Sequence, residues 1–144
     1  MASDVGKALR TKLLESSALT DLIATRFYPD VIPQSAELPA VAYYKISTIR
    51  EHTLDNCTRL AHSRIQVDCF AEKDNGGRDR ANDIAHAIRN SGICAFRGTV
   101  DGIAIQAVEI DDGDYYDNDP PTDGNQQHRY ITSLDFMVHY LEAA

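Results

Sequence analysis

The sequence lacks a long hydrophobic run: nowhere among its 144 residues is there a stretch near the roughly 20 apolar residues that a membrane helix needs. Its first residues also lack the basic segment and apolar core of a secretory signal. Cysteine is scarce, and Cys57, Cys69 and Cys94 are too widely spaced for a Cys-x-x-Cys clip. We therefore expect a protein of the reducing cytosol, with Cys69 and Cys94 buried in strands as small apolar groups.

Concentrated positive charge is also missing, since the formal net charge is −8. A protein that grips nucleic-acid phosphates needs a dense basic surface, so the balance argues against that class and against binding to anionic membranes. The arginines are scattered along the chain, which suits ion pairs between proteins better than a phosphate track. Six of them are Arg59, Arg64, Arg78, Arg80, Arg89 and Arg97.

No catalytic motif is present. The histidines are His52, His62, His86, His128 and His139, and no two of them have the i, i+4 spacing of a helical zinc pair. Gly76-Gly77 precedes a predicted helix, yet it lacks the further glycines or the lysine of a phosphate-binding loop. Nothing nearby in the sequence activates Cys57 for a nucleophilic role with His62. We predict no enzyme activity, no cofactor and no metal.

The segment 111–128 is rich in aspartate, proline and glycine and has no apolar period, so we expect a long exposed loop. A calcium loop counted from Asp119 would place Gly124 correctly at its sixth position, but Pro121 and Tyr130 then occupy ligand positions and the pattern fails. A solvated acidic loop is the favoured interpretation, and a loose divalent-cation site is the alternative. The aspartates are Asp111, Asp112, Asp114, Asp117, Asp119 and Asp123.

What the sequence does contain is a clear strand, turn and helix over 63–92. Ile65, Val67 and Cys69 alternate with polar residues, which is typical of a half-buried strand. The glycine pair ends the strand, Asp74 or Asn75 can cap the helix that follows, and Gly92 can end it. The helix has an apolar stripe at i, i+3, i+4 and i+7. The stripe consists of Ala81, Ile84, Ala85 and Ile88.

The remaining patterns predict one α+β domain, residues 1–144, with a mixed, mainly antiparallel sheet of about five strands. An N-terminal helix pair and the central helix are expected to pack on this sheet. Proline makes 26–39 an irregular connector, Asp101-Gly102 predicts a tight hairpin, and a phase change near Gln106 predicts a bulge. The expected strands are 40–50, 59–72, 93–99, 103–110 and 130–140.

Several of these segments follow one another in an order that is typical of one protein family. They are Arg26–Pro29, Leu38–Tyr44, Arg64–Ala71 with the alanine-rich helix after it, Phe96–Thr99 and Ser133–Val138. In this order the chain resembles the tail-completion (tail-terminator) proteins of long-tailed bacteriophages, which take part in head–tail joining. The resemblance extends over roughly residues 5–141.

The resemblance implies a structural protein without catalytic residues. It implies a homo-oligomeric ring, expected to be a hexamer, at the head-proximal end of the tail in the virion, assembled in the host cytoplasm. Such a ring ends growth of the tail tube and forms the surface that meets the head connector. Its partners would be the major tail tube protein and head connector proteins, while DNA would pass through the bore without specific binding.

We expect the acidic loop to face the bore or a partner. The alternatives are another head–tail connector or adaptor, a small non-viral protein-binding module, and a metal-dependent hydrolase that uses the aspartates.

Overall fold

The computed structural model describes residues 4–33, 36–52, 54, 57–111, 115–120 and 128–142. The helices are α1 (Val5–Leu13), α2 (Ser17–Ile23) and α3 (Gly77–Arg89), with short 3₁₀ turns η1 (Lys73–Asn75) and η2 (Ile93–Ala95). The strands are β1 (Phe27–Pro29), β2 (Ala40–His52), β3 (Cys57–Glu72), β4 (Gly98–Val100), β5 (Ile103–Ile110), β6 (Tyr115–Asp119) and β7 (Arg129–Leu141).

These strands form one mixed sheet in the order β1-β2-β3-β7-β5-β4, with β6 also paired to β7. The β1–β2 pair is parallel, and all the other pairs are antiparallel. The predicted α+β class and the mainly antiparallel sheet are confirmed. The sheet has seven strands instead of about five, because β1 and β6 were not predicted.

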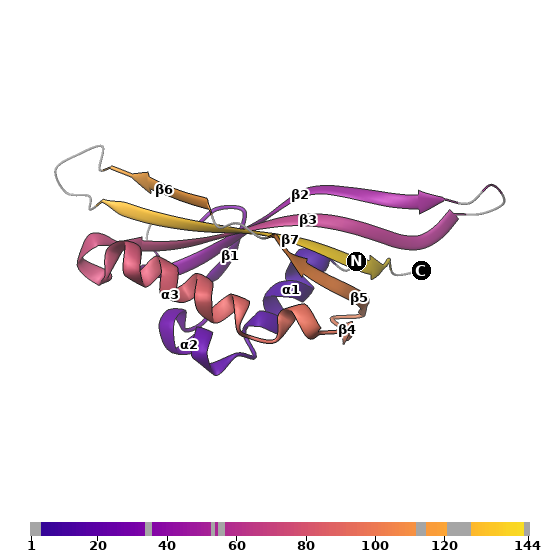
Figure 1. Ribbon diagram of the computed structural model, residues 1–144, viewed down its shortest axis with the longest axis horizontal. Coiled ribbons are helices and arrows are strands. Elements are labelled where there is room, and N and C mark those ends of the chain that lie inside the picture. Colours follow the sequence, from indigo (N-terminus) through magenta and orange to yellow (C-terminus); the bar gives the residue numbers. More distant parts are fainter. Residues whose placement is uncertain are drawn as a thin grey trace.

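Strand β7 is the middle of this sheet. It pairs with β3 along its whole length, from Arg129 opposite Glu72 to Leu141 opposite Leu60. Its other edge is shared: β5 covers Phe136 to Leu141, and β6 covers Arg129 to Ser133. Strand β6 therefore continues the line of β5 along the same edge of β7, as Figure 1 shows.

The predicted turns of the sheet are present. Strands β4 and β5 form the hairpin at Asp101-Gly102, where Val100 lies opposite Ile103. A register shift between Ile105 and Ala107 confirms the bulge expected in β5. The β2–β3 pair is also antiparallel and has irregularities of its own after Lys45 and Arg50.

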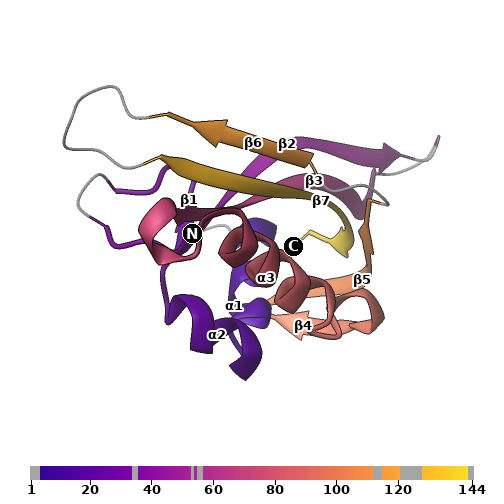
Figure 2. The same cartoon turned by 60° about the vertical axis from the view of Figure 1, so that its left-hand side comes forward.

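The helices cover one face of the sheet and leave the other free (Figures 1 and 2). Alternate residues of β3 and β7 point to the helices and are fully buried, for example Ile65, Val67 and Leu134. Every residue of the predicted α3 stripe is buried there as well. Each such Ile or Leu contributes about 1.5–3 kcal/mol of transfer free energy, so this layer holds the fold together.

The N-terminal helices complete the same layer. Asp4 caps α1, because its Oδ1 accepts a hydrogen bond of 3.1 Å from the Gly6 amide. Leu9 and Leu13 of α1 and Leu19 and Ile23 of α2 are buried in the core. Among the described residues, none of the helices has both the length and the apolar character to cross a membrane.

Several local predictions were wrong. Residues Ile93–Ala95 form the 3₁₀ turn η2 instead of a strand, and Cys94 is exposed, whereas Cys69 is buried as expected. Helix α3 begins after Gly76, without a side-chain cap, because the positive φ angles of Gly76 (101°) and Gly77 (55°) turn the chain directly into the helix. The segment 111–128 is not a loop throughout, since it includes β6.

Candidate functional site

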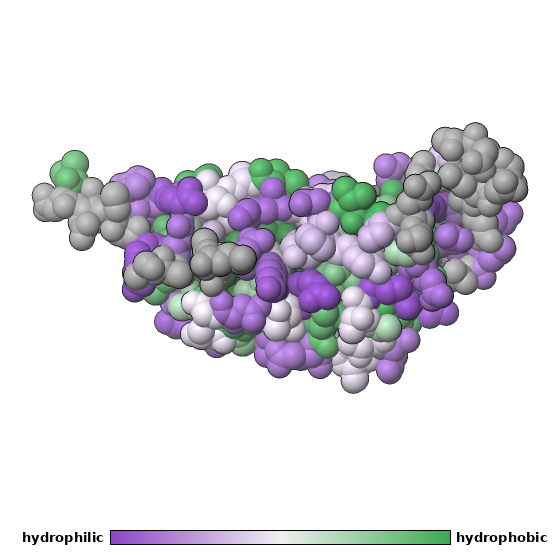
Figure 3. Space-filling view, turned by 180° about the vertical axis from the view of Figure 1, so that it is seen from behind, coloured by the Kyte–Doolittle hydropathy of each residue, from purple (hydrophilic) through white to green (hydrophobic). Residues whose placement is uncertain are grey.

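The helix-free face of the sheet carries the polar side chains of β3 and β7. It is built from the residues that alternate with the core, such as Arg64, Gln66 and Asp135. Figure 3 shows one side of the molecule, on which hydrophobic residues lie in small patches between hydrophilic ones. Ionisable groups converge on the helix-free face, which makes it the candidate site.

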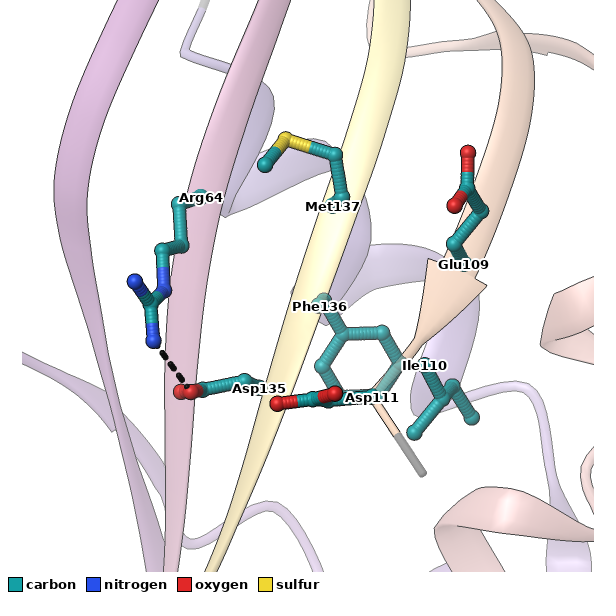
Figure 4. Close-up of a pocket in the computed structure, with 7 residues that line it drawn as sticks. All are labelled: Arg64, Glu109, Ile110, Asp111, Asp135, Phe136 and Met137. Atoms are coloured by element: carbon teal, nitrogen blue, oxygen red, sulfur yellow. Dashed lines mark hydrogen bonds and ion pairs between the residues drawn. The ribbon is translucent and has the colours of Figure 1, made fainter. Parts of the chain in front are cut away.

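A hollow of about 400 Å³ opens on this face where β5 leaves β7 (Figure 4). Inside it Arg64 Nη2 donates a hydrogen bond of 2.7 Å to Asp135 Oδ2. This bond and the charge of Asp135 raise the pKa of the Arg64 guanidinium. The lining residues are Arg64, Glu109, Ile110, Asp111, Asp135, Phe136 and Met137. One arginine therefore faces three carboxylates, and the hollow is net acidic.

A row of four side chains crosses the sheet beyond the hollow. His62 Nδ1 lies 2.5 Å from His139 Nδ1, and the two rings meet edge to face. The Nε2 atoms lie 2.8 Å from Glu51 Oε1 and 2.7 Å from Glu109 Oε1, respectively. A hydrogen bond between two Nδ1 atoms needs a proton on one and a lone pair on the other. The row therefore links β2, β3, β7 and β5 through a histidine pair held between two carboxylates.

At the other end of the face, Asp68 is a nearly buried carboxylate. It is 8% exposed, and its Oδ1 accepts hydrogen bonds from Ser133 Oγ at 2.6 Å and from Gln66 Nε2 at 2.9 Å. The Tyr44 hydroxyl also bonds to Asp68. Burial of Tyr44, followed by the charge and hydrogen bond of Asp68, raises the pKa of this phenol. These donors satisfy the carboxylate and lock β2, β3 and β7 in register.

Arg78, in the first turn of α3, holds β6 in place. Its Nη1 donates to the Ile131 carbonyl at 2.7 Å and to Thr132 Oγ1 at 3.2 Å, and its Nη2 donates to the Asp117 carbonyl at 2.5 Å. The guanidinium also lies over the rings of Tyr116 and Tyr130. One helix residue thus fastens β6 to β7. From the sequence, Arg78 was only one of the scattered arginines, because its partners are distant in the chain.

Three of the six predicted acidic residues of 111–128 lie in the described part of the chain. Asp111 is exposed at the end of β5, and its amide donates to the Asp135 carbonyl at 2.9 Å. Tyr115 donates to Asp111 Oδ2 at 3.3 Å, and the charge of Asp111, with this bond, raises the pKa of the Tyr115 phenol. Asp117 and Asp119 lie on β6. Asp112, Asp114 and Asp123 are outside the described residues.

The side chains of this face interact mainly with one another. Within the described part of the chain, no three His, Cys, Asp or Glu side chains are grouped so that they could hold a metal ion. Arg64 is paired with Asp135, and the two histidines of the row are paired with Glu51 and Glu109. Such an arrangement can stabilise the sheet face and recognise a charged neighbour.

Residues 7–131 match the protein family described as "Tail completion protein gp17". The chain belongs to this family. Membership makes it a structural protein of a phage tail, with the virion as its location. The family resemblance seen in the sequence is therefore confirmed.

The fold has a counterpart in a solved structure. A chain from "Virion of native gene transfer agent (GTA) particle" is similar to this one, with a TM-score of 0.67 and 13% sequence identity over 96% of this chain and 95% of that chain. At this identity the likeness shows the shared fold. A comparison with curated protein sequences gives no significant match.

The Arg78 contacts predict a local effect on β6. In Arg78→Ala the Asp117 and Ile131 carbonyls lose their charged donor, so the amides of β6 should exchange hydrogen at least about tenfold faster. Hydrogen exchange with peptide-level mass spectrometry measures this. Arg80→Ala, which removes the same charge from the same helix, is the control. Unchanged protection of the β6 amides in Arg78→Ala would contradict the role of Arg78 in attaching β6 to β7.

The Tyr44 environment predicts an alkaline loss of stability. The raised pKa means that the folded state keeps the phenol proton better than the unfolded state, where the pKa is about 10. The stabilisation is therefore complete below about pH 10 and is lost as the pH rises through the folded-state value. Tyr44→Phe should lower the free energy of unfolding by about 1 kcal/mol at pH 8, through the lost hydrogen bond. It should also flatten the fall in the free energy of unfolding above about pH 10, as urea unfolding can measure. A slope equal to that of the wild type would refute this.

Proposed function

We propose that this tail completion protein assembles into a closed ring of copies, a hexamer, on the end of the tail tube nearest the head. The ring ends tube growth and forms the surface that joins the tail to the head. Its partners are other copies of itself, the major tail tube protein and head connector proteins. The observation that carries the proposal is the family match over residues 7–131.

The geometry of the chain supports a role in assembly. A sheet with one helix-free face offers a broad surface, and its ionisable groups are held in fixed positions by ion pairs and hydrogen bonds. Fixed charges of this kind select a partner and its orientation more than they add affinity. The net acidic hollow beside Arg64 and Asp135 suits a basic side chain of a neighbour. We infer a structural and non-catalytic role.

Charge is consistent with a ring through which DNA passes. A net charge of −8 gives the protein no general attraction for phosphate, so DNA could move through a bore without being held. We propose that the acidic residues of 111–128 face this bore or a partner. Asp111 and Asp117 are both exposed in the described part of that segment.

Assembly is tested directly with purified protein and tail tubes of the same virion. We expect closed rings, or density at one end of each tube, in negative-stain images, and tubes that stop lengthening when the protein is added. Sedimentation velocity of the free protein gives its oligomeric state. A protein that stays monomeric and leaves tube growth unchanged would refute the ring. Binding only to the head connector would favour the adaptor alternative.

The acidic segment is tested by neutralisation. A variant with asparagine at Asp111, Asp112, Asp114, Asp117, Asp119 and Asp123 should reduce the yield of infectious particles by at least about tenfold, because the segment would no longer repel DNA or match its partner. A control variant carries asparagine at the exposed helix positions Asp21, Asp79 and Asp83. Normal assembly and particle yield in the first variant would exclude a role for this segment.

A further inference from the structure

The sheet ends in two free edges. Strand β1 pairs with β2 only at Val41 to Tyr43, and no described strand lies beside β2 from Lys45 to His52 on the side away from β3. Strand β6 likewise pairs with β7 on one side and has no described strand on the other. Figure 1 places β6 and the far part of β2 at opposite ends of the molecule.

The backbone of the β2 edge is directed outward. The Val41 amide donates to the Arg26 carbonyl at 2.9 Å, and the Tyr43 carbonyl accepts from the Asp30 amide at 2.8 Å, so these residues bond away from β3. Backbone N–H and C=O groups point to alternate sides along a strand, so those of Lys45 also point away from β3. This row of donors and acceptors can accept a further strand.

Apolar side chains gather on the same two edges. Six large hydrophobic or aromatic side chains are exposed among the described residues, and five belong to the β2–β3 hairpin or to β6. They are Ile46 (52% exposed), Ile49 (63%) and Leu54 (104%) in the hairpin, and Tyr115 (54%) and Tyr116 (60%) in β6, while Val31 lies elsewhere. Exposed isoleucine and tyrosine beside a free strand edge are typical of a surface that is buried against a partner.

The two free edges carry different charges. Lys45 and Arg50 of β2 lie opposite Ile65 and Ala61, so they point to the helix-covered face, where each pairs with a carboxylate of its own chain. Asp117 of β6 lies opposite Ile131 and points to the helix-free face. A closed ring of more than two copies needs two different surfaces that meet head to tail, whereas pairing β2 with β2, or β6 with β6, would give only a two-fold dimer.

We propose that β2 of one copy pairs with β6 of the next, so that the sheet continues from subunit to subunit. Ile49 lies opposite His62, and Tyr115 lies opposite Ser133, so both point to the helix-free face and would meet on that face of the joined sheet. Because the two edges differ, the contact is head to tail, and such contacts close into a ring when the rotation between copies allows it. This inference rests on the proposed ring and names its interface.

Two substitutions at Ile49 test the interface by charge alone. Both Ile49→Lys and Ile49→Glu remove the same exposed apolar group, so both should fold as the wild type does. Beside Asp117 of β6, which is on the same face as Ile49, glutamate is repelled and lysine is attracted. We expect the dissociation constant of the assembly, from sedimentation, to rise at least about tenfold more in Ile49→Glu than in Ile49→Lys. Equal effects of the two substitutions would overturn the proposal.

Disulfide trapping tests the pairing itself. In a background of Cys57→Ser and Cys94→Ser, protein with Ser47→Cys or Ile49→Cys is mixed with protein carrying Tyr115→Cys or Asp117→Cys and then oxidised. All four positions belong to the helix-free face, and cross-linking requires Cβ atoms within about 3.5–4.5 Å. Mixtures should form covalent dimers that neither protein forms alone. Thr48→Cys is the control, because Thr48 points to the helix-covered face, where it bonds Ser63 at 2.8 Å.

The outcomes separate the interface from the function. Rings that form without these cross-links, or cross-links between two copies of β2, would overturn the edge pairing and leave the proposed ring intact. A protein that forms no assembly, either free or on tail tubes, would overturn both. Cross-links from the mixtures only, together with the charge effect at Ile49, would establish the interface.

Discussion

The fold depends on hydrogen bonding to both sides of β7. This 13-residue strand has β3 on one edge and needs partners along the whole of the other. Strand β5 provides them for Phe136 to Leu141, and β6 provides them for Arg129 to Ser133. A buried backbone group without a partner costs about as much free energy as a lost hydrogen bond. Pairing with β7 can therefore stabilise β6, although β6 has few apolar residues of its own.

The same requirement explains what could be predicted from the sequence. Strands β3 and β7 alternate because one face is buried, and α3 has a helical stripe for the same reason, so both could be predicted from period alone. Strand β6 is Tyr-Tyr-Asp-Asn-Asp, which has no such pattern, and it exists because β7 offers it an edge. Strand β1 is three residues with a proline and depends on β2 in the same way.

The candidate surface was less predictable than the fold. Arg64 and Asp135, or His62 and His139, are brought together by the register of β3 on β7, and the sequence alone does not give that register. The family could be identified because several elements occur in a fixed order along nearly the whole chain. The prediction that Cys94 lies in a strand was wrong because an apolar tripeptide after a helix suits a 3₁₀ turn as well as a strand.

The way in which the two ends of the sheet are fastened has a consequence for ionic strength. Arg78 holds β6 through neutral carbonyl oxygens and aromatic rings, and dissolved salt weakens such contacts little. The far part of β2 pairs with β3, and its exposed ion pairs, Lys45 with Asp4 and Arg50 with Glu142, are additional contacts that salt screens. A rise in salt therefore weakens the side-chain contacts at the β2 end of the molecule more than those at the β6 end.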